Sequence, residues 1–188
     1  MIREFKNAIP IEKAYEARDL FLNVDYDLIQ QTRRNKFSYE KDSRFDGMPS
    51  EDEIFTAKFY RSGFLEKSKA IHAIYHSLIK PLIESTLKKE FSQHDIRCYK
   101  MEKGSHFRIH KDDYQSTYGF VWYLNVDWKW DWGGLLLVLK EGLNAEVFIP
   151  EFNKLVIMDH QSGQMPHAVT EITEYAKEPR LTMVGFLQ

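Results

Sequence analysis

The sequence predicts an α+β protein with a mainly β core, built as a double-sheet jelly roll with N-terminal helices packed on one sheet. Two observations predict it. Apolar residues recur at helical spacing in the first half, and after Asp95 the chain breaks into short runs separated by turn residues. We expect a single domain, 1–188, in which residues 1–94 are mainly helical support and residues 95–188 form the jelly-roll core. The helices alone lack a second apolar layer against which to bury their faces.

Two helices are expected in the first half. Residues 11–23 follow Pro10 and place apolar side chains on one face. Residues 64–91 carry a stronger helical pattern, and Pro81 should kink this helix or split it in two. The polar stretch 39–53 is expected to be a loop, and a loop of this length inside a domain is often functional.

The second half is expected to be a succession of short strands. Turn residues such as Gly104, Gly133-Gly134 and Ser162-Gly163 separate runs rich in β-branched and aromatic residues. The expected strands lie near residues 96–101, 106–111, 117–126, 134–140, 145–149, 154–159, 166–173 and 180–187, and residues 26–32 are also compatible with a strand.

Composition and charge narrow the functional classes. The formal net charge is −2, so no global field points to a nucleic-acid partner, and no apolar run is long enough to predict a membrane span. Cys98 is the only cysteine, which excludes an intramolecular disulfide and zinc sites built on several thiolates. The N-terminus lacks the apolar segment of a signal peptide, so we expect a reducing, cytoplasmic location. Monomer and homodimer both remain open.

A metal site is suggested by His110 and Asp112, which lie at i and i+2 at the end of an expected strand. Such residues point to the same face of a strand, whereas the neighbouring Asp113 is aimed away. His167 opens a later strand after Pro166 and supplies a second histidine. Two histidines and one carboxylate suit Fe(II) and leave coordination positions open. Taken one by one, these residues are equally compatible with polar strand ends.

An anion site is suggested by Arg180 and Thr182, which share one face of the last expected strand. A buried arginine needs an anionic partner, and its planar fork suits a carboxylate. Glu178 within the chain and the carboxylate of a ligand are the two alternatives.

These motifs together closely resemble the Fe(II)/2-oxoglutarate-dependent dioxygenases, and within them the prolyl 4-hydroxylase-like branch. The resemblance covers about residues 96–187, and the first half matches only loosely, as supporting helices. It lies in the order of His110-x-Asp112, Tyr123-Leu124-Asn125, Gly133-Gly134, Pro166-His167-x-Val169 and Arg180-x-Thr182.

The resemblance implies a fold and a set of residue roles. The fold of that family is the double-stranded β-helix, which is a jelly roll. His110, Asp112 and His167 would be the iron ligands. The cosubstrate residues would be Arg180 as salt-bridge partner of the far carboxylate, Tyr123 as a hydroxyl that helps to hold it, Tyr99 as part of the pocket lining, and Thr182 as a hydroxyl assisting Arg180.

The implied activity is that of an Fe(II)- and 2-oxoglutarate-dependent hydroxylase that consumes O2; participation of ascorbate stays open. The favoured substrate is a prolyl or other side chain of a peptide or protein. A small molecule such as a free amino acid is the alternative. A noncatalytic jelly-roll binding module is the rival from another class.

Several further residues have two interpretations. His160 and His106 are expected to be ordinary loop and strand residues, with substrate contact or support of the metal site as the alternatives. The three tryptophans could cap the core or form a platform for a substrate or a second subunit. These tryptophans are Trp128, Trp130 and Trp132.

Two further sets of residues are expected around the site. The apolar pocket wall is expected to include Val121, Leu135, Leu137, Ile157 and Val184. A basic patch, expected to be mainly solvated, consists of Arg33, Arg34, Lys36 and Arg44.

Overall fold

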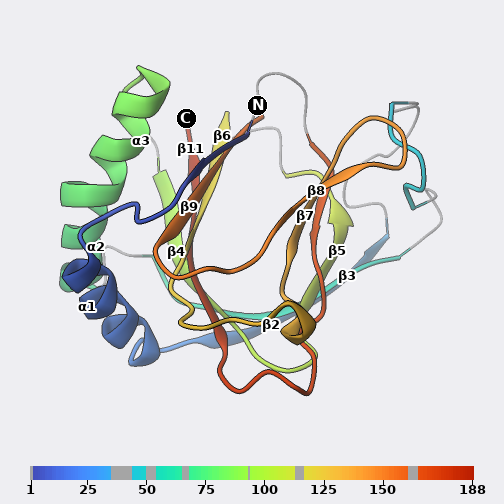
Figure 1. Cartoon of the computed structure of the whole chain (residues 1–188), viewed down its shortest axis with the longest axis horizontal. Helices are drawn as coiled ribbons and strands as arrows, with labels where there is room; N and C mark the ends of the chain where they lie inside the picture. Colours follow the sequence, from blue (N-terminus) through green and yellow to red (C-terminus); the bar gives the residue numbers. More distant parts are fainter. Residues whose placement is uncertain are drawn as a thin grey trace.

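The chain forms a strongly curved β-sheet with helices on one side, as the computed structural model shows (Figure 1). The structure describes residues 2–34, 44–49, 54–64, 68–92, 94–112, 117–160 and 165–188. The expected loop at 39–53 lies partly outside these residues. Within it, Phe45 forms an isolated bridge with Gly142. None of the described helices has the length and apolar character needed to cross a membrane.

Eleven strands of the described residues join in one sheet with antiparallel pairings. They are β1 (Ile2–Phe5), β2 (Asp27–Arg34), β3 (Ile54–Arg61), β4 (His94–Met101), β5 (His106–His110), β6 (Tyr118–Tyr123), β7 (Leu136–Leu139), β8 (Ala145–Phe148), β9 (Lys154–Asp159), β10 (His167–Val169) and β11 (Arg180–Leu187). Their order across the sheet is β1-β9-β6-β11-β4-β3-β5-β10-β7-β8, and β2 pairs with β3. The sheet curls so that its two halves form opposite walls of a half-barrel, which matches the predicted jelly roll (Figure 1).

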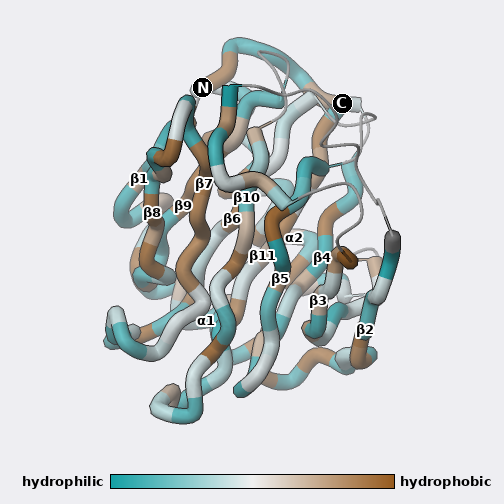
Figure 2. The backbone as a smooth tube through the Cα atoms, turned by 90° about the vertical axis from the view of Figure 1, so that its right-hand side faces the viewer, coloured by the Kyte–Doolittle hydropathy of each residue, from teal (hydrophilic) through white to brown (hydrophobic). Residues whose placement is uncertain are grey.

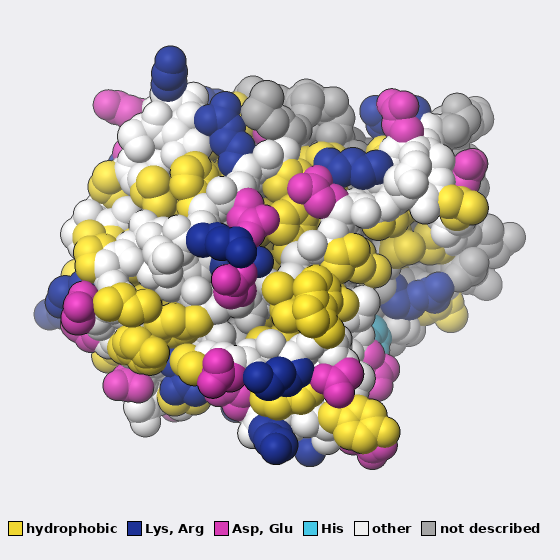
Figure 3. Space-filling model, in the orientation of Figure 1, with side chains coloured by type: hydrophobic (Ala, Val, Ile, Leu, Met, Phe, Trp, Pro, Cys, Tyr) yellow, Lys and Arg dark blue, Asp and Glu magenta, His cyan; other side chains and the backbone are white. Residues whose placement is uncertain are grey.

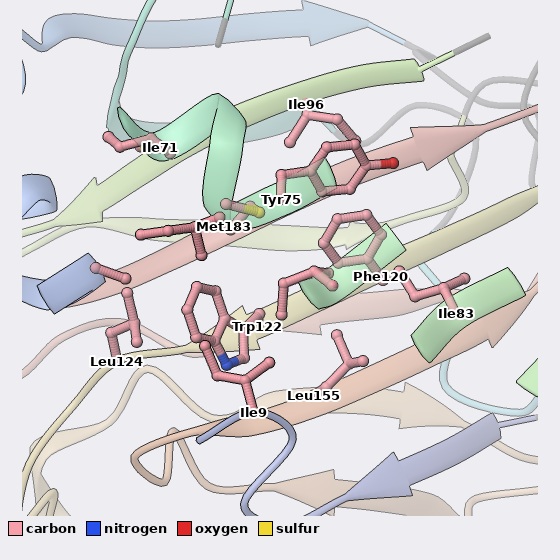
Figure 4. Packing of buried hydrophobic residues seen from close by; sticks show 14 of the residues in the cluster. Ile9, Ile71, Tyr75, Ile83, Ile96, Phe120, Trp122, Leu124, Leu155 and Met183 are labelled. Carbon is pink, nitrogen blue, oxygen red and sulfur yellow. The ribbon is translucent and has the colours of Figure 1, made fainter. Parts of the chain in front are cut away.

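The helices pack on the wall formed by β4, β11, β6 and β9 (Figure 1), as predicted. They are α1 (Ile11–Leu22), α2 (Lys69–Ile74), the π-helical turn η2 (Tyr75–Ile79) and α3 (Lys80–Leu87). Figure 4 shows their side chains, including Ile71, Tyr75 and Ile83, gathered around Phe120 and Trp122 of the sheet. Burial of this apolar surface fixes the helices to one side and leaves the other side of the wall for a pocket.

Strand β6 contributes side chains both to the core beneath the helices and to the interior of the half-barrel. All its residues are buried, which is the pattern of a strand covered on both faces. Phe120 and Trp122 pack among the helices, whereas Val121 and Tyr123 belong to a cluster on the opposite face. Hydrophobic stretches lie along the strands while many turns are hydrophilic (Figure 2). Alternate residues of the strand therefore build the core and the interior of the half-barrel.

The first half of the chain differs from the mainly helical support expected for it. It contributes β1, β2 and β3 to the sheet. Strand β2 covers the stretch that was compatible with a strand. In β3 the alternation of Phe55, Ala57 and Phe59, all buried, is a strand signal that was missed. The four-residue β1 is too short to show a pattern, and its pairing with β9 holds it in place.

The second expected helix runs from Lys69 to Leu87 with a π-helical turn in the middle. This turn ends at Ile79, directly before the turn that contains Pro81. Proline lacks an N–H and its ring clashes with the carbonyl four residues earlier. The wider π-helical turn accommodates this clash. Pro81 therefore causes a bulge within a continuous helical stretch and does not separate two helices.

Candidate active site

Strand pairing brings His110 and His167 together. His110 is the last residue of β5, His167 is the first residue of β10, and the two residues are direct partners in the antiparallel register. Their ring centroids lie 4.4 Å apart. Asp112 follows β5 and places Oδ1 3.6 Å from His110 Nε2 and Oδ2 3.5 Å from His167 Nε2. The three ligand atoms all lie within 4.8 Å of one another, a spacing that fits one metal ion.

Backbone carbonyls orient both imidazoles toward the centre of this group. His110 Nδ1 lies 2.8 Å from the carbonyl oxygen of Arg108, and His167 Nδ1 lies 3.0 Å from that of Met165. Each Nδ1–H donates to its carbonyl, so each Nε2 keeps a lone pair for a metal. Both histidines are buried, and Phe55 packs edge-on against the His110 ring. The donor set of two nitrogens and one carboxylate suits Fe(II) and leaves positions open. The neighbouring Asp113 lies outside the described residues.

The predicted cosubstrate residues form a row across three strands. Thr182 of β11 pairs with Tyr99 of β4 on one side and with Tyr123 of β6 on the other. Arg180 lies two residues before Thr182 on the same face, next to Met101. Its guanidinium lies 5.1 Å from the ring centroid of Tyr123. The four residues predicted from the sequence are thus neighbours on the inner face of the half-barrel.

Arg180 is buried without an acidic partner among the described residues. The residue is 3% exposed, and its Nη1 lies 3.4 Å from the sulfur of Met101. Glu178, the alternative partner within the chain, instead forms a 2.7 Å ion pair with Arg18. Buried charges without partners are rare because desolvation is costly. The arrangement therefore fits a carboxylate supplied by a ligand.

Three buried polar atoms around this arginine have no hydrogen-bond partner in the part of the chain that the structure describes: Arg180 Nε, Tyr123 Oη and Thr182 Oγ1. Burial raises the pKa of Tyr123 above its usual value, so the phenol stays protonated and offers a donor. Burial also raises the pKa of Tyr99, which stacks on Phe59 with 5.0 Å between centroids. One cation with two hydroxyl groups matches the oxygens of a carboxylate.

Gly134 packs closely against Arg180, with Trp128 beside it. Gly134 has a φ of +66°, and a Cβ there would lie 2.9 Å from Arg180 Cδ and 2.5 Å from Ile172 Cδ1. Trp128 and Trp132 are buried and pack edge to face at 5.2 Å. These two indoles therefore cap the core, which was one of the two interpretations. Trp130, in the same short 3-10 helix as Trp132, is 63% exposed.

A pocket of about 760 Å³ connects the metal-binding group with Arg180. Val121 and Val184 line it as expected, but Leu136 takes the place predicted for Leu135 and Leu137. Alternation in β7 decides this, because Leu136 and Val138 face inward. Ile157 faces the helices and not the pocket. The lining also includes Arg33 and Arg61, so one residue of the expected solvated patch lines the site.

His160 is a site residue that sequence reasoning placed in an ordinary loop. It follows β9 directly, is buried, and has Nε2 3.5 Å from Asp112 Oδ2. Its position after a strand that faces the pocket was the available signal. By contrast, His106 points away from the centre and contacts Thr56 Oγ1 at 3.0 Å, as an ordinary strand residue would.

Comparisons with known proteins agree with this geometry. The family model described as 2OG-Fe(II) oxygenase superfamily matches residues 96–188. No curated protein matches the sequence. A prolyl-4-hydroxylase structure from Pseudomonas putida is 16% identical, with a TM-score of 0.65 over 100% of this chain and 91% of that chain.

Two further structures have the same fold. A prolyl hydroxylase from Trichoplax adhaerens, solved with a peptide fragment of the hypoxia inducible factor oxygen degradation domain, is 15% identical, with a TM-score of 0.69 over 99% of this chain and 82% of that chain. An oxidoreductase of the 2OG-Fe(II) oxygenase family from Burkholderia pseudomallei is 12% identical, with a TM-score of 0.69 over 100% and 84%.

Members of this superfamily are oxidoreductases that use Fe(II), 2-oxoglutarate and O2, and the donor groups described above are of the kind that these cofactors require. The matched residues are those that carry the ordered motifs. Residues 96–188 therefore belong to the 2OG-Fe(II) oxygenase superfamily, and the fold of the chain is that of the prolyl 4-hydroxylase-like enzymes.

Proposed function

We propose that this oxygenase hydroxylates a side chain of a peptide or protein, with a prolyl residue as the preferred target. The fold shared with prolyl hydroxylases supports this, and one of those structures holds a peptide fragment. The pocket of about 760 Å³ is in the range that holds a drug-sized ligand, so it has room for a substrate residue beside 2-oxoglutarate. It also reaches the exposed Arg33, which gives a longer chain a way in.

In this proposal one wall of the half-barrel binds the metal and the other binds the cosubstrate. His110, Asp112 and His167 hold Fe(II), and Arg180 with Tyr123 and Thr182 binds the far carboxylate of 2-oxoglutarate. When bound, the iron, 2-oxoglutarate and O2 supply the oxidation that places a hydroxyl on an unactivated C–H bond. The apolar wall of the pocket keeps water from the carboxylate and strengthens its pairing with Arg180.

The observation that carries the proposal is the buried Arg180, whose charge has no acidic partner in the described residues, within one pocket with the metal-binding group. A purely structural arginine would be paired, as Arg18 is with Glu178. A noncatalytic binding module has no need for both features in one cavity.

A first experiment tests the class of chemistry. Under anaerobic conditions, Fe(II) and 2-oxoglutarate are added to the protein and the visible charge-transfer band of the chelate is recorded. We expect the band with the wild-type protein and its loss in His167→Ala. A folded wild-type protein without the band would refute the proposal.

A second experiment tests the substrate. Succinate formation is measured with proline-containing peptides and with free amino acids, and hydroxylated products are identified by mass spectrometry. We expect peptides to stimulate turnover more strongly. Stimulation by free amino acids alone would refute a peptide substrate.

The second candidate, a free amino acid or other small acid, is favoured by Arg61. This residue lines the pocket, pairs in register with Tyr99, and has no acidic partner among the described residues. Its guanidinium could hold a substrate carboxylate. In that case Arg61→Met would raise the KM for the small substrate and leave the affinity for 2-oxoglutarate unchanged.

A further inference from the structure

A third histidine lies beside the proposed metal centre. His160 directly follows β9 and is buried, with 8% of its surface exposed. Its Nε2 lies 3.5 Å from Asp112 Oδ2, the same distance that separates this oxygen from His167 Nε2. Two imidazoles thus approach the same carboxylate oxygen from different elements.

Both nitrogens of His160 lack a hydrogen-bond partner in the described part of the chain. An imidazole always carries at least one N–H donor, and a buried donor without an acceptor is destabilising. The nearby His110 and His167 each have Nδ1 bound to a backbone carbonyl. For His160, the acceptor that the structure places near Nε2 is Asp112 Oδ2, at 3.5 Å.

The chain makes room for this ring. A Cβ added at Gly119 of β6 would lie 2.8 Å from His160 Nε2, closer than nonbonded side chains approach. Gly119 also lines the pocket. A glycine within a strand weakens it and commonly marks a close approach of another group. Here the group that approaches is the ring nitrogen nearest to Asp112.

The position of His160 distinguishes it from the three expected ligands. The atoms of His110, Asp112 and His167 all lie within 4.8 Å of one another, and His160 is not part of this group. The contact that joins it to the group is with Asp112. This arrangement is that of a residue that acts on a ligand rather than on the metal.

We propose that His160 is a positioning residue of the metal centre: its Nε2–H donates to Asp112 Oδ2 when the metal is bound and keeps Asp112 as a one-oxygen ligand. The inference rests on the proposed metal site. A carboxylate can bind a metal through one oxygen or two. An oxygen that accepts a hydrogen bond from His160 is held away from the metal, so the positions needed by a chelating cosubstrate and O2 remain open.

The test measures metal binding and spectroscopy, not turnover alone. Co(II) is titrated into the protein and its absorption spectrum recorded, and the Fe(II)–2-oxoglutarate band is recorded without O2. For His160→Ala we expect a Co(II) affinity lower by about 10- to 100-fold, the effect typical of losing such a partner. We also expect a changed Co(II) spectrum and a shifted Fe(II)–2-oxoglutarate band. His160→Gln keeps an N–H at a similar distance and should recover most of the affinity.

Two further variants keep the inference falsifiable if His160→Ala does not fold. Gly119→Ala retains the imidazole but displaces it, so it should weaken Co(II) binding in the same direction. His76→Gln, at an exposed histidine of η2, is the matched control and should behave as wild type.

The outcomes separate the possibilities. Unchanged affinity and spectra in folded His160→Ala would overturn the inference. Complete loss of metal binding, as expected for His167→Ala, would also overturn it, because His160 would then be a fourth ligand. A wild-type protein that binds Co(II) but gives no Fe(II)–2-oxoglutarate band would refute the proposed function and leave the role of His160 open to the Co(II) measurement.

Discussion

Replacing Arg180 by methionine should separate the stability of the protein from its affinity for 2-oxoglutarate. Methionine fills much of the volume of arginine and matches the neighbouring Met101. Because Arg180 is buried without an acidic partner among the described residues, its removal eliminates an uncompensated charge. We therefore expect Arg180→Met to unfold at the same temperature as the wild type or higher in the absence of 2-oxoglutarate.

The effect on binding should be opposite and large. Removing one partner of a buried charge pair costs about 3–5 kcal/mol, which corresponds to roughly 2 to 3.5 powers of ten in Kd. The assay is thermal unfolding with Mn(II) and increasing 2-oxoglutarate. At a concentration of about 100 times its Kd, the ligand stabilises the wild type by about 2.7 kcal/mol. For a chain of this size that is an increase in Tm of about 5–11 °C, which the variant should lack.

Arg18→Met is the matched control. Arg18 is half-buried and paired with Glu178 at 2.7 Å, so this variant should lose stability and keep the full response to 2-oxoglutarate. If Arg180→Met retained the response, or if it alone lost stability without ligand, Arg180 would be a structural residue and the assignment of the cosubstrate site would be wrong.

Three smaller predictions follow from the same structure. Tyr123→Phe removes a buried hydroxyl that has no hydrogen-bond partner among the described residues, so it should weaken 2-oxoglutarate binding by about 1.5–3 kcal/mol in a titration without lowering the Tm of the free protein. Gly134→Ala should destabilise by at least about 1–3 kcal/mol in urea unfolding, since φ is +66° and the added Cβ meets Ile172; an unchanged midpoint would contradict this. Burial raises the pKa of the Cys98 thiol, so iodoacetamide should label it only after denaturation, as mass spectrometry would show.

The sequence was informative wherever a local pattern decides the structure. Alternation located β4 to β11, and the i and i+2 spacing of Arg180 and Thr182 placed both on one inner face. The direct pairing of His110 with His167 depends on which strands become neighbours. The sequence permitted this pairing without specifying it, since these residues are far apart in the chain.

The misses have physical causes. Leu135 and Leu137 were assigned to the pocket wall because an unbroken apolar run does not reveal which alternate residues look inward. Ile157 was misassigned because β9 is buried on both faces. His160 follows a strand end, where alternation no longer fixes the direction of a side chain. Residues such as these are placed by the packing of the whole sheet.

The short pairing of β3 with its neighbours β4 and β5 affects how firmly the two walls are held together. This strand joins the two walls, yet it pairs with β4 only at Tyr60 and Arg61 and with β5 only at Ala57 and Lys58. The metal-binding residues lie on the β5 side of this seam, and Arg180 lies on the other side. A molecule of 2-oxoglutarate bound to the metal at one end and to Arg180 at the other would span this seam and hold the two walls together. Loading the site should therefore slow amide exchange in β3.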